Sequence, residues 1–267
     1  MMIKTWYEEL GIKEHYYADD SVCIINGDCL EVLPQITSNS MDAVITDPPY
    51  GTTACAWDEV IPLKDMWNAI TALRKDKTPV ALFGSEPFAS LLRVSNIRSF
   101  KYDWVWRKNR GSNFATLRYQ PMKEHETISV FYPHNYYPIK QKRSGGGLSR
   151  VAYKFKPSNT GKRETTNGFV LDKNKTKSTQ SELRFPSSVQ DCNTEVGLHP
   201  TQKPLPLIKY LVETYSKPNE IILDFALGSG TTALATKQTN RKCVGIEISE
   251  EYCELATIRY LRSLNDQ

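Results

Sequence analysis

A buried apolar run enters a glycine-rich turn and then a helix close to the C-terminal end of this chain, in the sequence IILDFALGSGTTALA at residues 221–235. Gly228, Gly230 and Ala233 fit the pattern G-x-G-x-x-G/A, and Glu247 ends the next apolar run roughly 20 residues beyond Gly228. Glycines let the backbone approach a ligand, the helix N-terminus offers free N–H groups, and an acid at this spacing reaches the ribose hydroxyls of a nucleotide. The pattern predicts a nucleotide-binding α/β fold, and it leaves NAD and S-adenosylmethionine as alternative ligands.

Apolar runs alternate with helical patterns along most of the chain. We expect strands at 22–26, 41–46, 79–84, 102–106, 127–132, 220–225 and 242–248, and helices at 62–75, 87–95, 204–216 and 250–264. Continuous apolar strands of this kind are typical of a parallel sheet covered on both faces. The predicted fold class is therefore α/β, with a doubly wound, mostly parallel, Rossmann-like sheet.

Residues 133–198 interrupt this alternation. They contain 12 Lys or Arg and 5 Asp or Glu, so that this stretch is strongly basic although the whole chain has a formal charge of only +4. They include the run SGGG at 144–147 and no sustained apolar period. A long surface loop is one interpretation; an inserted region that binds a polyanionic partner is the one we favour, because aromatic residues are scattered through it.

The sequence disfavours secreted, membrane-spanning, zinc-ribbon and disulfide-rich proteins. The N-terminal sequence MMIKTWYEELGIKEHYY has no apolar signal segment, and the longest apolar runs, such as PVALFG, are too short to cross a bilayer. The six cysteines include no CxxC pair, which argues against a zinc ribbon or a disulfide framework. We expect a cytoplasmic protein with reduced thiols and no metal site.

A second motif, MDAVITDPPYG at residues 41–51, places an acid at the end of a buried strand. Ligands gather at this end of a sheet. The exocyclic amine of a nucleobase is a poor nucleophile because its lone pair is delocalised, and acceptors on both N–H bonds would localise that pair. The Asp47 carboxylate and the Pro48 carbonyl could be those acceptors, since Pro49 holds Pro48 extended. Tyr50 offers a face for an extruded base.

These motifs resemble the DNA amino-methyltransferases, which transfer the methyl group of S-adenosylmethionine to adenine N6 or cytosine N4. The tetrapeptide Asp47-Pro48-Pro49-Tyr50 is similar to their catalytic motif, and HPTQKP at 199–204 to their segment at the methionine part of the cofactor. NGDCLEVLP at 26–34 and KEHETISVFYP at 123–133 are also similar to family segments. The order of motifs resembles the beta subgroup, which implies a catalytic half at 1–132, a target-recognition insert at 133–198 and a cofactor half at 199–267.

The resemblance implies a role for each matching residue. Catalysis would involve Asp47, Pro48, Pro49 and Tyr50, and cofactor binding would involve Asp28, Asp47, Thr201, Lys203, Asp224, Phe225, Gly228, Ser229, Gly230, Thr231, Thr232 and Glu247. DNA contacts are expected from Lys140, Lys142, Arg143, Arg150, Lys154, Lys156, Lys162 and Arg163. The family loop runs Asp-Pro-Phe-x-Gly-x-Gly, whereas here Phe225 stands one position early and Ala226 takes the usual place of the aromatic.

Several functional alternatives follow from the same residues. A cytosine C5-methyltransferase would need a Pro-Cys dipeptide, which the chain lacks, and a dehydrogenase would leave the Asp-Pro-Pro-Tyr motif without a task. We expect site-specific methylation of adenine N6 in double-stranded DNA, with cytosine N4, RNA or a protein glutamine amide as alternative targets. A homodimer, a cognate restriction endonuclease and association with the nucleoid are left open.

Overall fold

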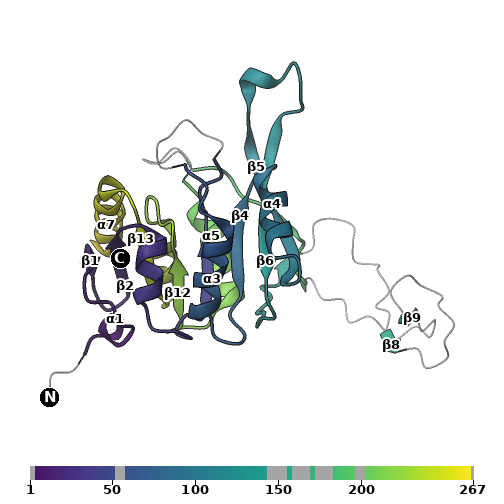
Figure 1. Ribbon diagram of the computed structural model, residues 1–267. Coiled ribbons are helices and arrows are strands. Elements are labelled where there is room, and N and C mark those ends of the chain that lie inside the picture. Colours follow the sequence, from purple (N-terminus) through teal and green to yellow (C-terminus); the bar gives the residue numbers. More distant parts are fainter. Residues whose placement is uncertain are drawn as a thin grey trace. The chain divides into compact units, whose positions relative to one another are not determined.

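The computed structural model in Figure 1 describes residues 4–51, 58–142, 155–157, 169–171, 183–195 and 202–265. The chain divides into two compact units, Met1–Tyr137 with Ser187–Gln267, and Pro138–Pro186. In the smaller unit β7 (Gln141–Lys142) pairs with β10 (Leu183–Arg184), and β8 (Phe155–Pro157) pairs with β9 (Phe169–Leu171), both antiparallel. The main sheet belongs to the larger unit.

The larger unit contains a sheet of nine described strands in the order β1-β2-β13-β12-β3-β4-β6-β5-β11. Their bounds are Tyr17–Ala18, Val22–Asn26, Lys242–Glu247, Ile221–Asp224, Ala43–Thr46, Val80–Gly84, Lys123–Phe131, Phe100–Ser112 and Val189–Asp191, in that order. The five strands from β2 to β4 are mutually parallel; β1 and β6 run against their neighbours. The central strands are buried along nearly their whole length, as continuous apolar sequences require.

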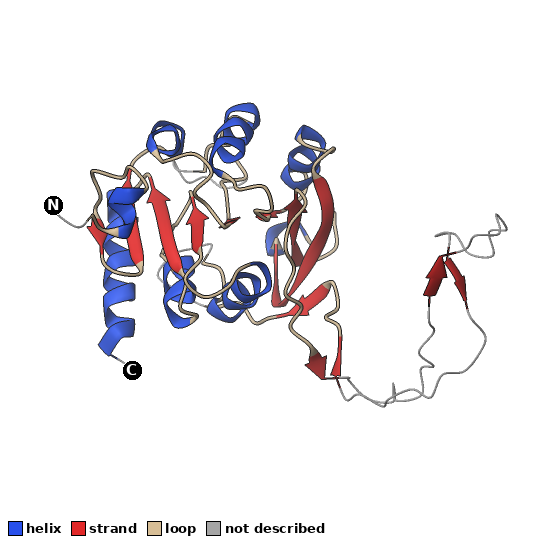
Figure 2. Ribbon diagram, turned by 90° about the horizontal axis from the view of Figure 1, so that it is seen from below, coloured by secondary structure: helices blue, strands red, loops and turns tan. Residues whose placement is uncertain are grey.

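Helices cover both faces of this sheet (Figure 2). One core joins the sheet to α2 (Cys29–Val32), α3 (Leu63–Leu73) and α4 (Phe88–Ser95). Two further cores join the opposite face to α5 (Leu205–Tyr215), α6 (Thr231–Gln238) and α7 (Glu250–Asn265). The short α1 (Trp6–Glu9), η1 (Leu33–Gln35) and η2 (Phe114–Thr116) complete the described elements.

The α/β class and the mostly parallel, doubly wound sheet are as predicted. Strands β5 and β6 are longer than the sequence indicated, since their polar ends form a hairpin beyond the core. Strand β11 lies within the range expected for the insert, yet it pairs in parallel with β5 of the main sheet. Among the described residues, no helix has the length and apolar character needed to span a membrane.

Candidate active site

Four carboxylates lie at the carboxyl ends of four neighbouring parallel strands. Asp28 follows β2, Glu247 ends β13, Asp224 ends β12, and Asp47 follows β3. Because parallel strands end at the same edge of a sheet, all four line one cavity of about 1320 Å³. The glycine loop, which joins β12 to α6, and the Asp-Pro-Pro-Tyr motif are far apart in the sequence. Both therefore line the same cavity.

The glycine loop is tied to the end of β13 through the Glu247 carboxylate. The Gly228 amide donates to Glu247 Oε2 at 2.7 Å, and the Ser249 amide donates to Oε1 at 2.9 Å. Burial raises the pKa of Glu247, and these backbone donors oppose the rise. A carboxylate has about four acceptor positions, so Glu247 can also accept from a ribose hydroxyl. This donor and acceptor set fits the adenosine of S-adenosylmethionine.

Gly230 makes the turn into α6 sterically feasible. Its φ of 79° lies in the left-handed region, and a Cβ there would approach the Ala256 Cβ to 2.7 Å and the Ala256 Cα to 3.0 Å. Thr231 and Thr232 begin α6 and line the cavity, as do Gly228 and Ser229. Gly230 is not among the described lining residues, so its part in the loop is conformational.

Arg259 of α7 supports the loop from behind, a contact that the sequence did not predict. Its guanidinium donates to the Ser229 carbonyl and, at 2.7 Å, to Ser229 Oγ. Gln202 lies on the other side of this serine, with its Oε1 accepting from Ser229 Oγ at 3.3 Å. The loop is thus held from α7 and from the segment that precedes α5.

Asp224 is buried at the end of β12 and hydrogen-bonded there. It accepts from Thr46 Oγ1 at 2.6 Å and from the Ala226 amide at 3.2 Å, and burial raises its pKa to about 6. The next residue, Phe225, is 2 % exposed and packs in the core beneath the cavity while also lining it. Ala226 lines the cavity beside it.

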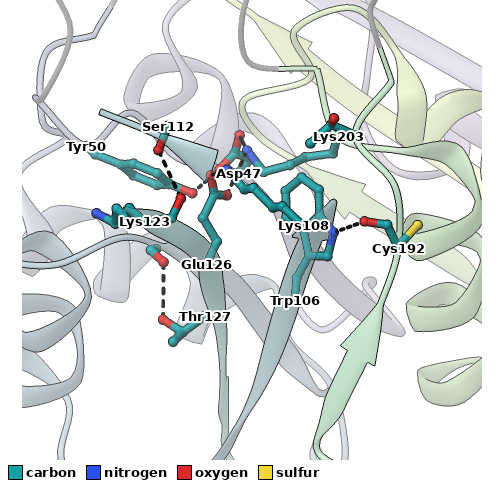
Figure 3. A network of polar contacts seen from close by, with 12 residues as sticks. Asp47, Tyr50, Trp106, Lys108, Ser112, Lys123, Glu126, Thr127, Cys192 and Lys203 are labelled. Carbon is teal, nitrogen blue, oxygen red and sulfur yellow. Dashed lines mark hydrogen bonds and ion pairs between the residues drawn. The ribbon is translucent and has the colours of Figure 1, made fainter. Parts of the chain in front are cut away.

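Asp47 belongs to a network of buried and half-buried charged groups (Figure 3). One carboxylate oxygen accepts from the Tyr50 hydroxyl, and the other pairs with the Lys203 ammonium. Lys203 Nζ also lies 3.5 Å from Glu126 of β6, which pairs with Lys108 of β5. Two carboxylates and two ammonium groups make this network formally neutral. Charges that leave water are costly unless they are paired in this way.

Burial and charge act against each other within this network. Burial raises the pKa of Asp47, although the Lys203 ammonium opposes the rise. Burial would also raise the pKa of Glu126, but Lys203 and Lys108 together hold it below its ordinary value. Burial would lower the pKa of Lys203, but Asp47 and Glu126 hold it above its ordinary value. Lys203 therefore stays charged at neutral pH.

Tyr50 is fixed in place by its neighbours. Its amide donates to Asp58 Oδ1 at 2.8 Å, the Gly51 amide donates to the same oxygen at 3.0 Å, and its ring stacks on Phe88 with centroids 5.1 Å apart. Burial, followed by the Asp47 charge, raises the pKa of Tyr50 well above its ordinary value. A base that stacks on Tyr50 has to use the ring face turned away from Phe88.

The remaining predicted residues are placed as follows. Asp28 is the N-cap of α2, accepting from the Leu30 amide at 2.8 Å, and it lines the cavity. Lys140 and Lys142 are exposed in the smaller unit, and Lys156 lies in β8. Thr201, Arg143, Arg150, Lys154, Lys162 and Arg163 lie outside the described residues.

The sequence did not single out Lys108, Glu126, Asp58, Phe88 or Arg259, all of which contact predicted site residues. Glu126 lies in the segment KEHETISVFYP, among the polar residues 123–127 that precede the buried run 128–131, so no local pattern distinguishes it. The other four residues lie in segments that match no motif, and only the folded chain brings them to the site.

A doubly wound sheet whose glycine loop, Glu247 and Asp-Pro-Pro-Tyr motif open into one cavity is the arrangement of an S-adenosylmethionine-dependent methyltransferase. When bound, that cofactor supplies an activated methyl group. Residues 41–258 match the family model of N6/N4 methyltransferases, described as DNA methylases. The chain belongs to this family of DNA methyltransferases.

Individual relatives agree with this assignment. The chain is 26 % identical over 266 residues to the DNA adenine methyltransferase YhdJ of Escherichia coli K12, covering 93 % of this chain and 86 % of that protein. It is 26 % identical over 249 residues to the type II methyltransferase M.HpaI of Haemophilus parainfluenzae, covering 88 % and 73 %. The solved complex of M1.HpyAVI with S-adenosylmethionine shares the fold, with a TM-score of 0.59 and 23 % identity over 89 % of this chain and 99 % of that one.

Proposed function

We propose that the protein methylates adenine N6 in double-stranded DNA, at a base rotated out of the helix into the cavity. The observation that carries the proposal is the position of Asp47, which opens into the same cavity as the glycine loop and Glu247. Asp rather than Ser at this position is typical of the adenine-modifying relatives that the motif resembles, and one relative bears an adenine methyltransferase name. Cytosine N4 is the second candidate, because the family includes both chemistries.

The Asp47 carboxylate acts as an acceptor for the target amine. Each of its oxygens holds one partner, Tyr50 or Lys203, and each retains a lone pair for a further hydrogen bond. The Pro48 carbonyl accepts the second N–H of the amine, and the two bonds localise the nitrogen lone pair toward the activated methyl group. After transfer, the nitrogen loses its proton to Asp47 or to solvent.

Lys203 serves this step by keeping Asp47 ionised. Without the ammonium, a buried carboxylate would take up a proton and lose its value as an acceptor. Glu126 and Lys108 hold that ammonium in turn. We expect Lys203 to act through Asp47 as well as at the methionine part of the cofactor.

The basic unit Pro138–Pro186 is proposed to bind the DNA backbone, with polar side chains reading base edges in a groove. This interpretation rests on its Lys and Arg residues, of which Lys140 and Lys142 are exposed. We expect the enzyme to act on DNA in the cytoplasm, at the nucleoid. Pairing with a restriction endonuclease and homodimer formation are tested separately, by genome context and by solution mass.

Nucleoside analysis tests the proposal. The purified protein is incubated with S-adenosylmethionine carrying a deuterated methyl group and with duplex DNA, RNA or a bulk protein acceptor. Each product is digested and analysed by mass spectrometry. We expect deuterated N6-methyladenine from duplex DNA. Label in N4-methylcytosine would assign the second candidate, and label in RNA or glutamine alone would refute DNA as the substrate.

A further inference from the structure

Asp58 holds the backbone at the end of the Asp-Pro-Pro-Tyr motif, although it has no part in the proposed chemistry. Its Oδ1 accepts from the Tyr50 amide at 2.8 Å and from the Gly51 amide at 3.0 Å. The residue is 8 % exposed and lines the cavity that also contains Asp47. One buried carboxylate oxygen therefore binds two consecutive peptide groups beside the reacting atoms.

These two amides are the first backbone N–H groups that follow Asp47 in the chain. Pro48 and Pro49 have none, because their nitrogens lie in pyrrolidine rings. The peptide groups on either side of Pro48 therefore cannot donate a hydrogen bond that would hold them in place. The next two N–H groups of the chain both donate to Asp58.

A fixed Tyr50 amide also fixes the Pro48 carbonyl. Peptide groups are planar, so that only the two backbone dihedrals of Pro49 separate this carbonyl from the Tyr50 N–H. The ring of Pro49 locks its φ at about −65°, which leaves its ψ as the one soft torsion between the two groups. A carboxylate that holds the Tyr50 amide thus sets the direction of the Pro48 carbonyl.

The same contact orients the Tyr50 side chain. The ring stacks on Phe88 with centroids 5.1 Å apart, and its hydroxyl donates to Asp47 (Figure 3). Both contacts depend on where the Tyr50 backbone lies. Asp58 therefore acts on two groups of the motif, a carbonyl and an aromatic ring.

Gly51 lets the two amides converge on one oxygen. Its φ of 67° lies in the left-handed region, and a Cβ there would approach Val60 Cγ2 to 2.8 Å. Successive amides at a turn that contains a left-handed residue form a concave site for an anion. The Asp58 carboxylate is that anion. Residues 58–62 line the cavity as well, so the contact joins two parts of its wall.

We propose that Asp58 is a positioning residue for methyl transfer, which aims the Pro48 carbonyl and the Tyr50 ring at the target base. The inference rests on the proposed function, in which that carbonyl accepts the second N–H of the target amine. Asp58 acts through Pro48 and Tyr50, and the position of its oxygen rather than its charge is what the reaction requires.

Three substitutions at Asp58 separate the position of the oxygen from its charge. Asp58→Asn retains an acceptor at the place of Oδ1 without the charge, Asp58→Glu retains the charge but moves the acceptor by one methylene group, and Asp58→Ala removes both. Single-turnover rates of methyl transfer to duplex DNA are measured. We expect a rate constant within a few-fold of wild type for Asp58→Asn. For the other two variants we expect a decrease of about tenfold to 100-fold, because a misplacement of about 1 Å has an effect of this size.

Two further measurements distinguish positioning from a general effect on folding. The Kd for S-adenosylmethionine should stay at the wild-type value, because Glu247 is tied to the glycine loop without Asp58; thermal melting shows that each variant is folded. In a double-mutant cycle, Tyr50→Ala combined with Asp58→Ala should slow transfer by less than the product of the two single effects, because both remove the same ring placement. Asp65→Ala, an exposed acid in the first turn of α3, is the matched control.

The outcomes separate this inference from the proposed function. If the wild-type enzyme methylates DNA and all three Asp58 variants match its rate, the role of Asp58 is refuted and the proposed function stands. A loss in Asp58→Asn as large as in Asp58→Ala would also overturn the inference, since charge would then matter more than position, and so would independent effects in the cycle. If Asp58→Ala does not fold, Asp58→Glu takes its place in the cycle. A wild-type enzyme that transfers no methyl group to DNA would instead contradict the proposed function itself.

Discussion

Lys203 forms ion pairs in the active site that its sequence motif did not predict. The segment HPTQKP resembles a cofactor-binding motif, and Lys203 was expected at the methionine part of the cofactor. The structure places its ammonium on Asp47, 156 positions away in the chain, and next to Glu126. A pairing over such a distance leaves no local pattern, because it depends on β3, β6 and the start of α5 meeting at one edge of the sheet.

Asp224 makes the stability of the protein depend on pH. Its pKa is about 6 in the folded chain against 3.8 as the ordinary value, so the folded state binds more protons between these limits. Stability therefore falls as pH rises from about 4 to above 6, by about 3 kcal/mol for this group. Asp224→Asn retains acceptors for Thr46 and Ala226 without the charge. We expect it to remove this fall, as measured by denaturant unfolding at pH values of about 4, 5, 6 and 7; parallel pH profiles for both proteins would contradict the assignment.

Glu247 is expected to control cofactor affinity. Its carboxylate holds the Gly228 amide and retains acceptor positions for a ribose. We expect Glu247→Ala to raise the Kd for S-adenosylmethionine about tenfold or more, since hydrogen bonds to a charged group are worth about 1.5–3 kcal/mol. Calorimetry checks this, with Glu250→Ala at the start of α7 as the matched control. Equal affinities for Glu247→Ala and wild type would remove Glu247 from the cofactor site.

At the scale of elements, the apolar runs predicted the central strands closely and the polar hairpin poorly. Strands expected at 22–26 and 79–84 are observed at Val22–Asn26 and Val80–Gly84, because continuous burial imposes an unbroken apolar sequence. Strand β5 was expected at 102–106 and extends to Ser112. Its outer residues are exposed on the projecting hairpin, where no core imposes an apolar period.

The turn into α6 is the element most sensitive to a single methyl group. Gly230→Ala would place a Cβ 2.7 Å from Ala256 Cβ on a backbone with φ of 79°. We expect a decrease of about 1–3 kcal/mol in unfolding free energy, with weaker cofactor binding, because strain and overpacking combine. Thermal and denaturant unfolding measure the decrease.

Gly27→Ala is the control for this turn. Its Cβ would lie 3.0 Å from a methyl group of the Val32 side chain, which can move, and its φ is outside the left-handed region. We expect a smaller decrease in stability there. A Gly230→Ala protein as stable as the Gly27→Ala protein would show that α7 and the loop separate readily.

At the scale of the whole molecule, the order of strands in the sheet explains how a catalytic motif near the start of the chain and a glycine loop near its end form one site. Strands β2 and β3 come from the first part of the chain and β12 and β13 from the last, yet the four are adjacent. This adjacency explains why a cofactor loop near the C-terminal end and a catalytic motif near position 47 line one cavity. Chain order thus places the basic insert between two halves of one site.

The insert is expected to supply salt-sensitive affinity for DNA. Combined substitution of Lys140, Lys142, Arg143 and Arg150 by alanine should lower the slope of log K against log salt, by up to about 0.9 for each phosphate that these side chains neutralise. Affinity for S-adenosylmethionine should not change, because every residue expected to bind the cofactor lies outside the insert. Fluorescence anisotropy with duplex DNA over a range of salt concentrations measures the slope. An unchanged slope would assign DNA binding to other surfaces.

The single-turnover rate of methyl transfer by Asp47→Ala, at saturating DNA and S-adenosylmethionine, tests the role of the catalytic motif most directly. The central claim is that the Asp47 carboxylate accepts the target amine in the cavity that also binds the cofactor. We predict that the rate constant falls about 100-fold or more, as for the removal of a positioned proton acceptor, while the Kd for S-adenosylmethionine changes little. A rate within a few-fold of wild type, in a folded protein that binds its cofactor, would contradict this role for Asp47.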